Sequence, residues 1–278
     1  MIASVSFAAN KPLPLLMGVL NVTPDSFSDG GRYAATDKAI AHARRMMDEG
    51  CDILDIGGES TRPASMPVTP QDEQKRVLPV FEALRSETQK RGVMLSIDTR
   101  HSSTMRAAWT AGADMFNDIT ALTYDPLSLQ TAAEAKVPVV LMHMKGEPQT
   151  MQKYPSYENV VNEVFDYLGQ RIMACIQAGI PKSMIVVDPG LGFGKTAQHS
   201  LTLLKNIGKF HELGVPVMLG ASRKSFIDAL AGPASPDDRL AGSLTAALYG
   251  AGAGIQLLRV HDVKETRQAL TLAKALQA

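Results

Sequence analysis

Carboxylate and amide side chains recur in this 278-residue chain at one kind of place, the carboxyl end of a short apolar run. Their oxygens accept hydrogen bonds, so such side chains brought together would bind a group rich in N–H donors. A single Asp or Asn after a strand usually caps the next helix, but recurrence at successive runs favours a binding site. The residues in these positions are Asn21, Asp55, Asp98, Asn117, Asp118 and Asp188.

Cationic side chains occupy other run ends. Lys224 lies in residues 222–225 (SRKS), directly after an apolar run, where basic residues at the start of a helix oppose its macrodipole. A role other than helix stability is therefore expected. Arg259 and His261 are two residues apart at the end of the last run, a spacing that directs both to one side. With Arg62, these residues predict a site for an anion beside the donor-binding one.

Two segments that follow the first two apolar runs contain too many functional residue types to be plain linkers. They are residues 21–31 (NVTPDSFSDGG) and 55–63 (DIGGESTRP). Gly, Ser, Thr, Asp and Pro keep a backbone open for hydrogen bonding, while Phe27 and Arg62 add one large side chain to each segment. We predict that both segments are ligand-binding loops.

A glycine-rich segment, residues 188–195 (DPGLGFGK), superficially resembles a phosphate-binding loop. It lacks the Lys-Ser or Lys-Thr ending of a nucleotide-binding loop in the required frame, so no nucleoside triphosphate site is predicted. We expect Lys195 to be a solvated loop lysine. His143 has no metal-ligand partner at a useful spacing, which predicts a packing or hydrogen-bonding role.

Short strands, three of them entered from a helical stretch that ends at glycine, are the elements that must position these side chains. Gly50, Gly112 and Gly214 stand between a helical stretch and an apolar run, the order of helix, glycine stop and strand. Most segments between the runs have helical periodicity. The eight predicted strands are residues 15–20, 51–56, 93–97, 113–118, 137–142, 184–187, 215–219 and 255–260.

Eight such units predict an α/β fold, a single (β/α)8 TIM barrel with long catalytic loops after strands 1 and 2. A doubly wound open sheet has similar alternation, but the chain lacks a Rossmann-type glycine fingerprint after the first strand and elements for a second domain. In a barrel the active site lies where the strands end, which is where the polar residues fall. We expect one catalytic domain over residues 15–278, preceded by an N-terminal extension, residues 1–14, that could be flexible.

Composition narrows the classes of partner. Lys plus Arg and Asp plus Glu each total 28, so the net charge is zero and no broad attraction to nucleic acid or to an anionic membrane is expected. The sequence has no apolar run of about 18 residues, and its start lacks the features of a secretory signal. Cys51 and Cys175 have no metal-type spacing and are expected to be reduced packing thiols. We therefore expect a soluble, cytoplasmic protein.

Several short motifs, in matching order and spacing, resemble those of the dihydropteroate synthase family. That family joins a dihydropterin pyrophosphate to p-aminobenzoate in folate biosynthesis. The resemblance extends from about residue 15 to the last helix. Besides the two loops, the matching motifs are SIDT (96–99), the pair Asn117 and Asp118, MHMKGEP (142–148), DPGLGFGK (188–195), GASRKS (220–225) and RVHD (259–262).

The resemblance implies a site in three parts. The pterin ring would be bound by Asp98, Asn117, Asp188 and Lys224, in a slot lined by Met142, Phe193 and Gly220. The diphosphate would be held by Asn21, Thr61, Arg62, Arg259 and His261, with Mg²⁺ on the diphosphate and on Asn21. The p-aminobenzoate pocket would be formed by Phe27, Thr61, Arg62, Pro63, Ser222 and Lys224.

The reaction that the resemblance implies is an SN1-like displacement, in which the bond to the diphosphate breaks before the amine of p-aminobenzoate attacks. The implied catalytic residues are Asp98, Lys224, Arg259 and His261. Asp98 would offset positive charge on the pterin while the cations stabilise the departing diphosphate. No protein nucleophile and no general base is predicted. The residues at Phe27 and Pro63 are those usual in drug-sensitive members, which predicts inhibition by sulfonamides.

Three rival functions fit parts of the pattern. A methyltetrahydrofolate methyltransferase also binds a pterin in a barrel, but it needs neither the Phe27 and Arg62 loops nor a clamp like that of Arg259 and His261. A pterin-binding module that has lost catalysis would lack the expected residue at position 21, 62, 224 or 259, but Asn21, Arg62, Lys224 and Arg259 are all present. A purely structural barrel gives no reason to gather so many charges at one mouth.

The resemblance also implies a homodimer, since members of the family are commonly dimeric. The apolar helices predicted at residues 240–250 and 270–276 could supply the interface. Packing of the same residues into the core explains them equally well.

Overall fold

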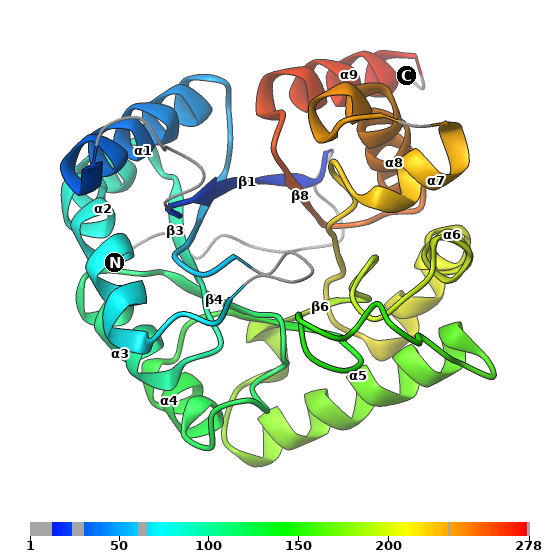
Figure 1. Ribbon diagram of the computed structural model, residues 1–278, viewed down its shortest axis with the longest axis horizontal. Helices are drawn as coiled ribbons and strands as arrows, with labels where there is room; N and C mark the ends of the chain where they lie inside the picture. The colour runs from blue at the N-terminus through cyan, green and yellow to red at the C-terminus, as the bar shows by residue number, and fades with distance from the viewer. Residues whose placement is uncertain (1–12, 24–30, 61–65, 233, 277–278) are drawn as a thin grey trace.

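The computed structural model describes residues 13–23, 31–60, 66–232 and 234–276, with residues 31–34 described by their backbone alone. Among these residues eight parallel strands are hydrogen-bonded in the order β6-β5-β4-β3-β2-β1-β8-β7, and a bridge between Val187 and Val217 joins the two ends of that order. The sheet is thus closed into the predicted TIM barrel (Figure 1). The strands are β1 (Leu15–Asn21), β2 (Ile53–Gly57), β3 (Met94–Asp98), β4 (Met115–Asp118), β5 (Val139–Met142), β6 (Ile185–Asp188), β7 (Met218–Leu219) and β8 (Leu257–Val260).

Helices alternate with the strands and form a ring outside them (Figure 1). Two of these helices, α7 and α8, lie between β7 and β8 in sequence. The α-helices of the described ranges are α1 (Gly31–Asp48), α2 (Pro70–Arg91), α3 (Ser102–Thr110), α4 (Ser128–Ala135), α5 (Val160–Gln177), α6 (Ala197–Lys205), α7 (Ser225–Ala231), α8 (Leu240–Gly252) and α9 (Val263–Ala275). Short 3-10 helices are η2 (Lys182–Met184), η3 (Ile207–Leu213) and η4 (Pro236–Arg239).

The predicted glycine stops are confirmed. Gly50, Gly112 and Gly214 have φ angles of 89°, 104° and 69°, in the left-handed region that ends a helix at low steric cost. Each directs the chain into the strand that follows.

All eight predicted strands are present, and their ends differ from the prediction by a few residues. The largest difference is at β7, where only Met218–Leu219 is regular instead of residues 215–219. Pro216 has no N–H to give to the sheet, and the N–H of Val217 bonds to the side-chain Oε1 of Gln256 at 2.8 Å. The regular hydrogen bonding of β7 therefore begins only at Met218.

Alternation along the strands sorts side chains between the barrel interior and the helices. The outward side chains pack with the helices in one large apolar cluster. The inward ones at the strand starts form a second, smaller cluster inside the barrel: Leu15, Met17, Ile53, Met94, Met115, Val140, Val186, Met218 and Leu257. Two residues further along, the inward positions become polar, as at Asp55, Ser96 and Asn117. Because every second side chain of a strand points into the barrel, these residues form a polar layer at its carboxyl-terminal mouth.

Cys51 and Cys175 are buried free thiols, as predicted. Within the described ranges no helix combines the length and the hydropathy needed to cross a bilayer. The predicted division into an extension, residues 1–14, and one catalytic domain, residues 15–278, stays a prediction because residues 1–12 lie outside the described part.

Candidate active site

A pocket opens at the carboxyl-terminal mouth of the barrel and encloses about 460 Å³, its open entrance included. It brings together ten of the residues predicted for the site, which come from six different strand ends. Its lining is Val19, Asp98, Asn117, Ile119, Met142, Asp188, Gly190, Phe193, Met218, Gly220, Ser222, Lys224, Arg259 and His261.

The base of the pocket is organised by Asp55, which is completely buried. Its carboxylate accepts hydrogen bonds from Ser96 Oγ at 2.6 Å, Asn117 Nδ2 at 2.9 Å and Arg259 Nε at 2.7 Å. Arg259 also donates through Nη2 to Oδ2 of Asp98 at 2.7 Å. Asp55 does not line the pocket itself, but its hydrogen bonds hold in place Asn117 and Arg259, which do line it.

Asp98 and Arg259 form the electrostatic centre of the pocket. Burial raises the pKa of Asp98 to about 7, although Arg259 beside it acts in the opposite direction. Burial alone would lower the pKa of Arg259, but Asp55 and Asp98 together raise it above its ordinary value. The pocket therefore contains a carboxyl group that changes charge near neutral pH next to a permanent cation.

Asp188 supplies the second carboxylate of the pocket. Its Oδ1 accepts the N–H of Gly190 at 2.7 Å, and burial raises its pKa. A Cβ on Gly220 would lie 3.3 Å from Oδ2 of Asp188, so the glycine leaves the second oxygen clear. Asp98, Asn117 and Asp188 thus present oxygen acceptors to the same pocket.

Lys224 reaches the pocket from the turn after β7, with its Nζ 3.9 Å from the ring centroid of Phe193. Arg223, just before it, has a φ of 58° and is fixed by Asp262, with Nη2 to Oδ1 at 2.6 Å. The basic residues at the start of α7 therefore have separate tasks, since Arg223 shapes the turn and Lys224 faces the pocket. Burial, with help from Arg259, lowers the pKa of Lys224 to about 8.

His261 and Ser222 lie side by side on the rim, with Nδ1 of His261 3.1 Å from Ser222 Oγ. Burial and the positive charges of Arg259 and Arg223 lower the pKa of His261 to about 3. Sequence reasoning grouped His261 with the cations, but without a ligand it is neutral. It can offer an N–H donor to an anion, while Arg259 supplies the charge.

Asn21 ends β1 at the same mouth. A Cβ on Gly57 would lie 3.7 Å from Oδ1 of Asn21 and 3.6 Å from Oδ2 of Asp98, so the glycine keeps the space between them open. The described residues contain no cluster of three His, Cys, Asp or Glu side chains that could hold a metal unaided. Mg²⁺ usually takes only one or two protein ligands and completes its shell with water and substrate phosphates, so a single amide oxygen fits it.

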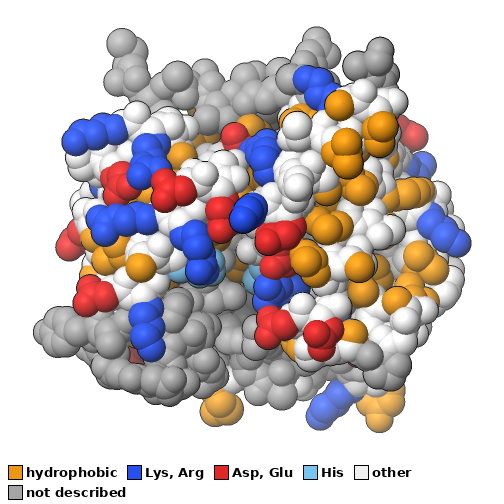
Figure 2. Space-filling model, turned by 90° about the horizontal axis from the view of Figure 1, so that it is seen from above, with side chains coloured by type: hydrophobic (Ala, Val, Ile, Leu, Met, Phe, Trp, Pro, Cys, Tyr) orange, Lys and Arg blue, Asp and Glu red, His pale blue; other side chains and the backbone are white. Residues whose placement is uncertain are grey.

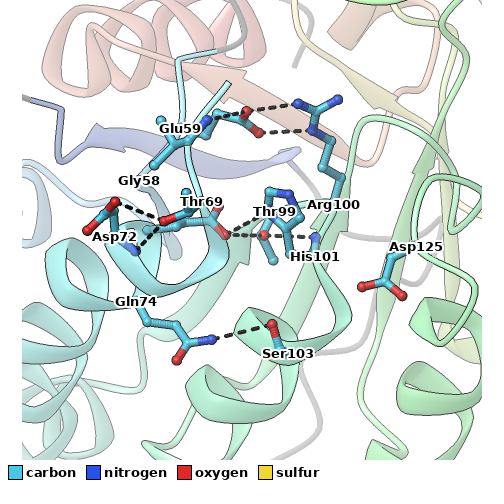
Figure 3. Close-up of polar contacts among 12 residues, drawn as sticks. Gly58, Glu59, Thr69, Asp72, Gln74, Thr99, Arg100, His101, Ser103 and Asp125 are labelled. Atoms are coloured by element: carbon cyan, nitrogen blue, oxygen red, sulfur yellow. Dashed lines mark hydrogen bonds and ion pairs between the residues drawn. The ribbon is translucent and has the colours of Figure 1, made fainter. Parts of the chain in front are cut away.

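Further polar contacts, made by residues that do not line the pocket, join the ends of β2 and β3 to the start of α2 (Figure 3). Glu59 and Arg100 form a bidentate ion pair with N···O distances of 2.8 and 3.0 Å, and both side chains are buried. Glu73 accepts from Thr99 Oγ1 at 2.9 Å and lies 3.1 Å from Nδ1 of His101. Sequence reasoning gave these residues no role, although Glu59 and Thr99 lie in quoted motifs, because nothing along the chain shows which partners they meet.

The interpretation of Lys195 as a solvated lysine is wrong. The residue is only 3% exposed, and its ammonium is surrounded by backbone carbonyl groups and His143. The hydrogen-bonding role predicted for His143 is confirmed.

Four of the predicted site residues, Phe27, Thr61, Arg62 and Pro63, lie outside the described residues. The pocket also has lining residues that sequence reasoning missed: Val19, Ile119, Gly190 and Met218. Two of these were within reach, because Val19 is two residues before Asn21 and Met218 is two before Gly220. The alternation that predicts the strands puts both on the inward face.

Comparison with known proteins agrees with this geometry. A family described as pterin binding enzyme matches residues 17–261. The dihydropteroate synthase of Escherichia coli K12 is 45% identical over 262 residues, which cover 94% of this chain and 91% of that protein.

Solved structures give the same result. Dihydropteroate synthase of Xanthomonas albilineans with 4-aminobenzoic acid is 48% identical, with a TM-score of 0.89 over 96% of this chain and 94% of that one. The Yersinia pestis enzyme in a sulfonamide drug complex is 42% identical, with a TM-score of 0.88 over 95% and 94% of the two chains. On this evidence the chain belongs to the pterin-binding enzyme family, among the dihydropteroate synthases.

Proposed function

We propose that the protein condenses 6-hydroxymethyl-7,8-dihydropterin pyrophosphate with p-aminobenzoate to give 7,8-dihydropteroate and pyrophosphate, as a dihydropteroate synthase of folate biosynthesis. The observation that carries this function is the pocket itself, in which Asp98, Asn117 and Asp188 face the cations Lys224 and Arg259. A pterin ring presents N–H donors and carries its reactive methylene next to an anionic diphosphate. Acceptors and cations in one pocket match both ends of that molecule.

The pterin ring occupies the deep part of the pocket in this proposal. Asp98, Asn117 and Asp188 accept its N–H groups, and Lys224 lies over one edge. Met142, Phe193 and Gly220 line the slot. The fixed positions of Asn117 and Arg259 around Asp55 mean that little reorganisation is needed when the ligand binds.

The chemical step is an SN1-like displacement supported by charge. As the methylene carbon separates from the diphosphate, positive charge spreads over the pterin, and the carboxylate of Asp98 offsets it. Arg259, with the N–H of His261, stabilises the departing diphosphate. No described thiol competes as a nucleophile, because Cys51 and Cys175 are buried outside the pocket and burial raises their pKa values to about 12 and about 11.

Mg²⁺ is part of the proposal, with Asn21 as its protein ligand. When bound, the ion would neutralise charge on the diphosphate and so favour its departure. Asn21 supports this assignment because its amide oxygen lies at the mouth beside Asp98, on the open side left by Gly57.

The p-aminobenzoate site is proposed at the rim of the pocket, with Ser222 and Lys224 on the described side and Phe27, Thr61, Arg62 and Pro63 completing it. The diphosphate subsite would likewise include Thr61 and Arg62. We also propose that sulfonamides bind where p-aminobenzoate does, and the sulfonamide complex of the Yersinia pestis enzyme supports this.

A homodimer is the proposed assembly. Helices α8 and α9 each have one buried and one exposed apolar side. Ala246, Ala247 and Leu270 pack in the core, while Tyr249 and Leu272 are exposed. Hydrophobic side chains also gather on one half of the face in Figure 2, on the side where α8 and α9 lie. The cytoplasm is the proposed location, since two buried free thiols suit a reducing compartment.

Pyrophosphate release by the purified protein tests the function. The pterin pyrophosphate is supplied with and without p-aminobenzoate, and with and without Mg²⁺. We expect release coupled to dihydropteroate formation and dependent on Mg²⁺, with a rate on the order of 100-fold lower in Asp98→Asn. Asp166→Asn, an exposed change on α5, should match the wild type. Pterin binding without turnover would identify a binding module instead of an enzyme.

A further inference from the structure

Lys195 has an ammonium group inside the protein, and its hydrogen-bond partners among the described residues are all neutral, although the charge of Asp188 acts on it from farther away. Its Nζ lies 2.9 Å from the carbonyl oxygen of Gly190, 3.0 Å from that of Phe193 and 3.2 Å from that of His143. The fourth neighbour is Nδ1 of His143, at 2.8 Å. Buried lysines are rare unless they are paired, because the charge loses its hydration. The arrangement of four neutral acceptors around a buried ammonium group therefore calls for an explanation.

The acceptors belong to the wall of the pocket. Gly190 and Phe193 line it, and His143 directly follows Met142, which lines it too. The two segments leave neighbouring strands, β5 and β6, whose residues Met142 and Asp188 are paired. Lys195 is not itself a lining residue, so its ammonium bonds to the wall from behind.

The two segments approach so closely that only glycine fits between them. A Cβ on Gly190 would lie 2.0 Å from the carbonyl oxygen of His143, and one on Gly194 would lie 2.2 Å from that of Lys145. Both glycines have positive φ angles, 68° and 64°. This close approach of the two segments turns several carbonyl oxygens toward one buried point. There, each carbonyl oxygen that lacks a hydrogen-bond donor costs folding free energy. An ammonium has three N–H donors and can satisfy three of them.

A reactive amine is the competing explanation, because burial lowers the pKa of Lys195 to about 7. The geometry argues against it. The nitrogen is occupied by the wall's own acceptors, and the side chain does not reach the pocket. Lys195 is thus placed to act through other residues.

We propose that Lys195 is a positioning residue that fixes the Gly190–Phe193 wall of the pterin slot against the end of β5. This inference rests on the proposed function, since it assumes that the slot takes a pterin. The ring of Phe193 lies against Nζ of Lys224, at 3.9 Å, so a displaced wall would also disturb that cation. Loss of the ammonium should weaken pterin binding more than p-aminobenzoate binding.

The test compares Lys195→Met with Lys145→Met. Lys145 is a matched control, a half-exposed lysine of the neighbouring segment that also donates to a carbonyl, that of Ser156 at 2.6 Å. Calorimetry with 6-hydroxymethylpterin measures the slot directly. We expect binding weaker by about tenfold or more in Lys195→Met and unchanged within about twofold in Lys145→Met, since a small misplacement of contacts has large effects. At saturating pterin pyrophosphate, the KM for p-aminobenzoate should change by less than about threefold.

Lys195→Gln, which keeps two N–H donors on a shorter stem, should give an intermediate loss and serves if Lys195→Met does not fold. Equal pterin affinity in wild type and a folded Lys195 variant overturns the inference, as does an equal loss for both substrates. If neither variant folds, the lysine serves the fold and not the slot, which also overturns it. A wild type that binds no pterin refutes the proposed function itself, a result distinct from these.

Discussion

The ion pair between Glu59 and Arg100 allows a quantitative prediction, because both side chains are almost fully buried, at 7% and 4% exposure. Arg100 binds both carboxylate oxygens and also lies 4.0 Å from the ring centroid of Tyr124. Glu59→Gln preserves shape but removes the charge that neutralises the guanidinium. An unpaired buried charge costs about 3–5 kcal/mol of folding free energy.

Urea unfolding measures this cost, with the fluorescence of Trp109, the single tryptophan, as the signal. If the chain loses stability at about 3 kcal/mol per molar urea, the midpoint should fall by about 1 M or somewhat more. Arg100→Gln should be as harmful, and the double variant should cost less than the sum of the two single changes.

Glu134→Gln is the matched control. Its partner Arg106 lies 2.8 Å away, but the two side chains are 43% and 50% exposed, so solvent screens the pair and the urea midpoint should hardly change. The reasoning is refuted if Glu59→Gln costs no more than Glu134→Gln, or if the two single changes of the buried pair are additive. Either result would mean that the pair is hydrated in solution and does not fix the ends of β2 and β3.

Two further predictions concern activity. The pKa of Asp98, raised by burial to about 7, and that of Lys224, lowered by burial to about 8, predict a bell-shaped dependence of kcat/KM on pH. Below the first value Asp98 is protonated and cannot offset charge on the pterin, and above the second Lys224 loses its charge, so activity should peak between the two pKa values. Asp98→Asn should abolish the loss of activity on the acid side, at a lower overall rate. An acid side that is unchanged in this variant contradicts the assignment. A sulfonamide should inhibit the wild type competitively with p-aminobenzoate, and inhibition that excess p-aminobenzoate does not relieve would disprove a shared pocket.

Local patterns in the sequence were enough for the architecture and for most of the pocket. Glycine stops and apolar runs predicted all eight strands, and polar residues at the run ends predicted the mouth. These signals are readable because alternation in a strand and the end of a helix depend only on nearby residues. The family resemblance, drawn from separate motifs, was confirmed by the comparisons.

Only the tertiary structure decided what each polar residue does. Asp55 and Asp98 look alike at their strand ends, yet Asp55 is sealed beneath the pocket by Arg259, 204 residues away, while Asp98 lines the pocket. Lys195 follows a glycine-rich turn that suggests a solvated residue, yet carbonyl groups from two strand ends surround it. Burial and charge pairing arise when the barrel closes and brings distant segments together, and no spacing along the chain encodes those distances.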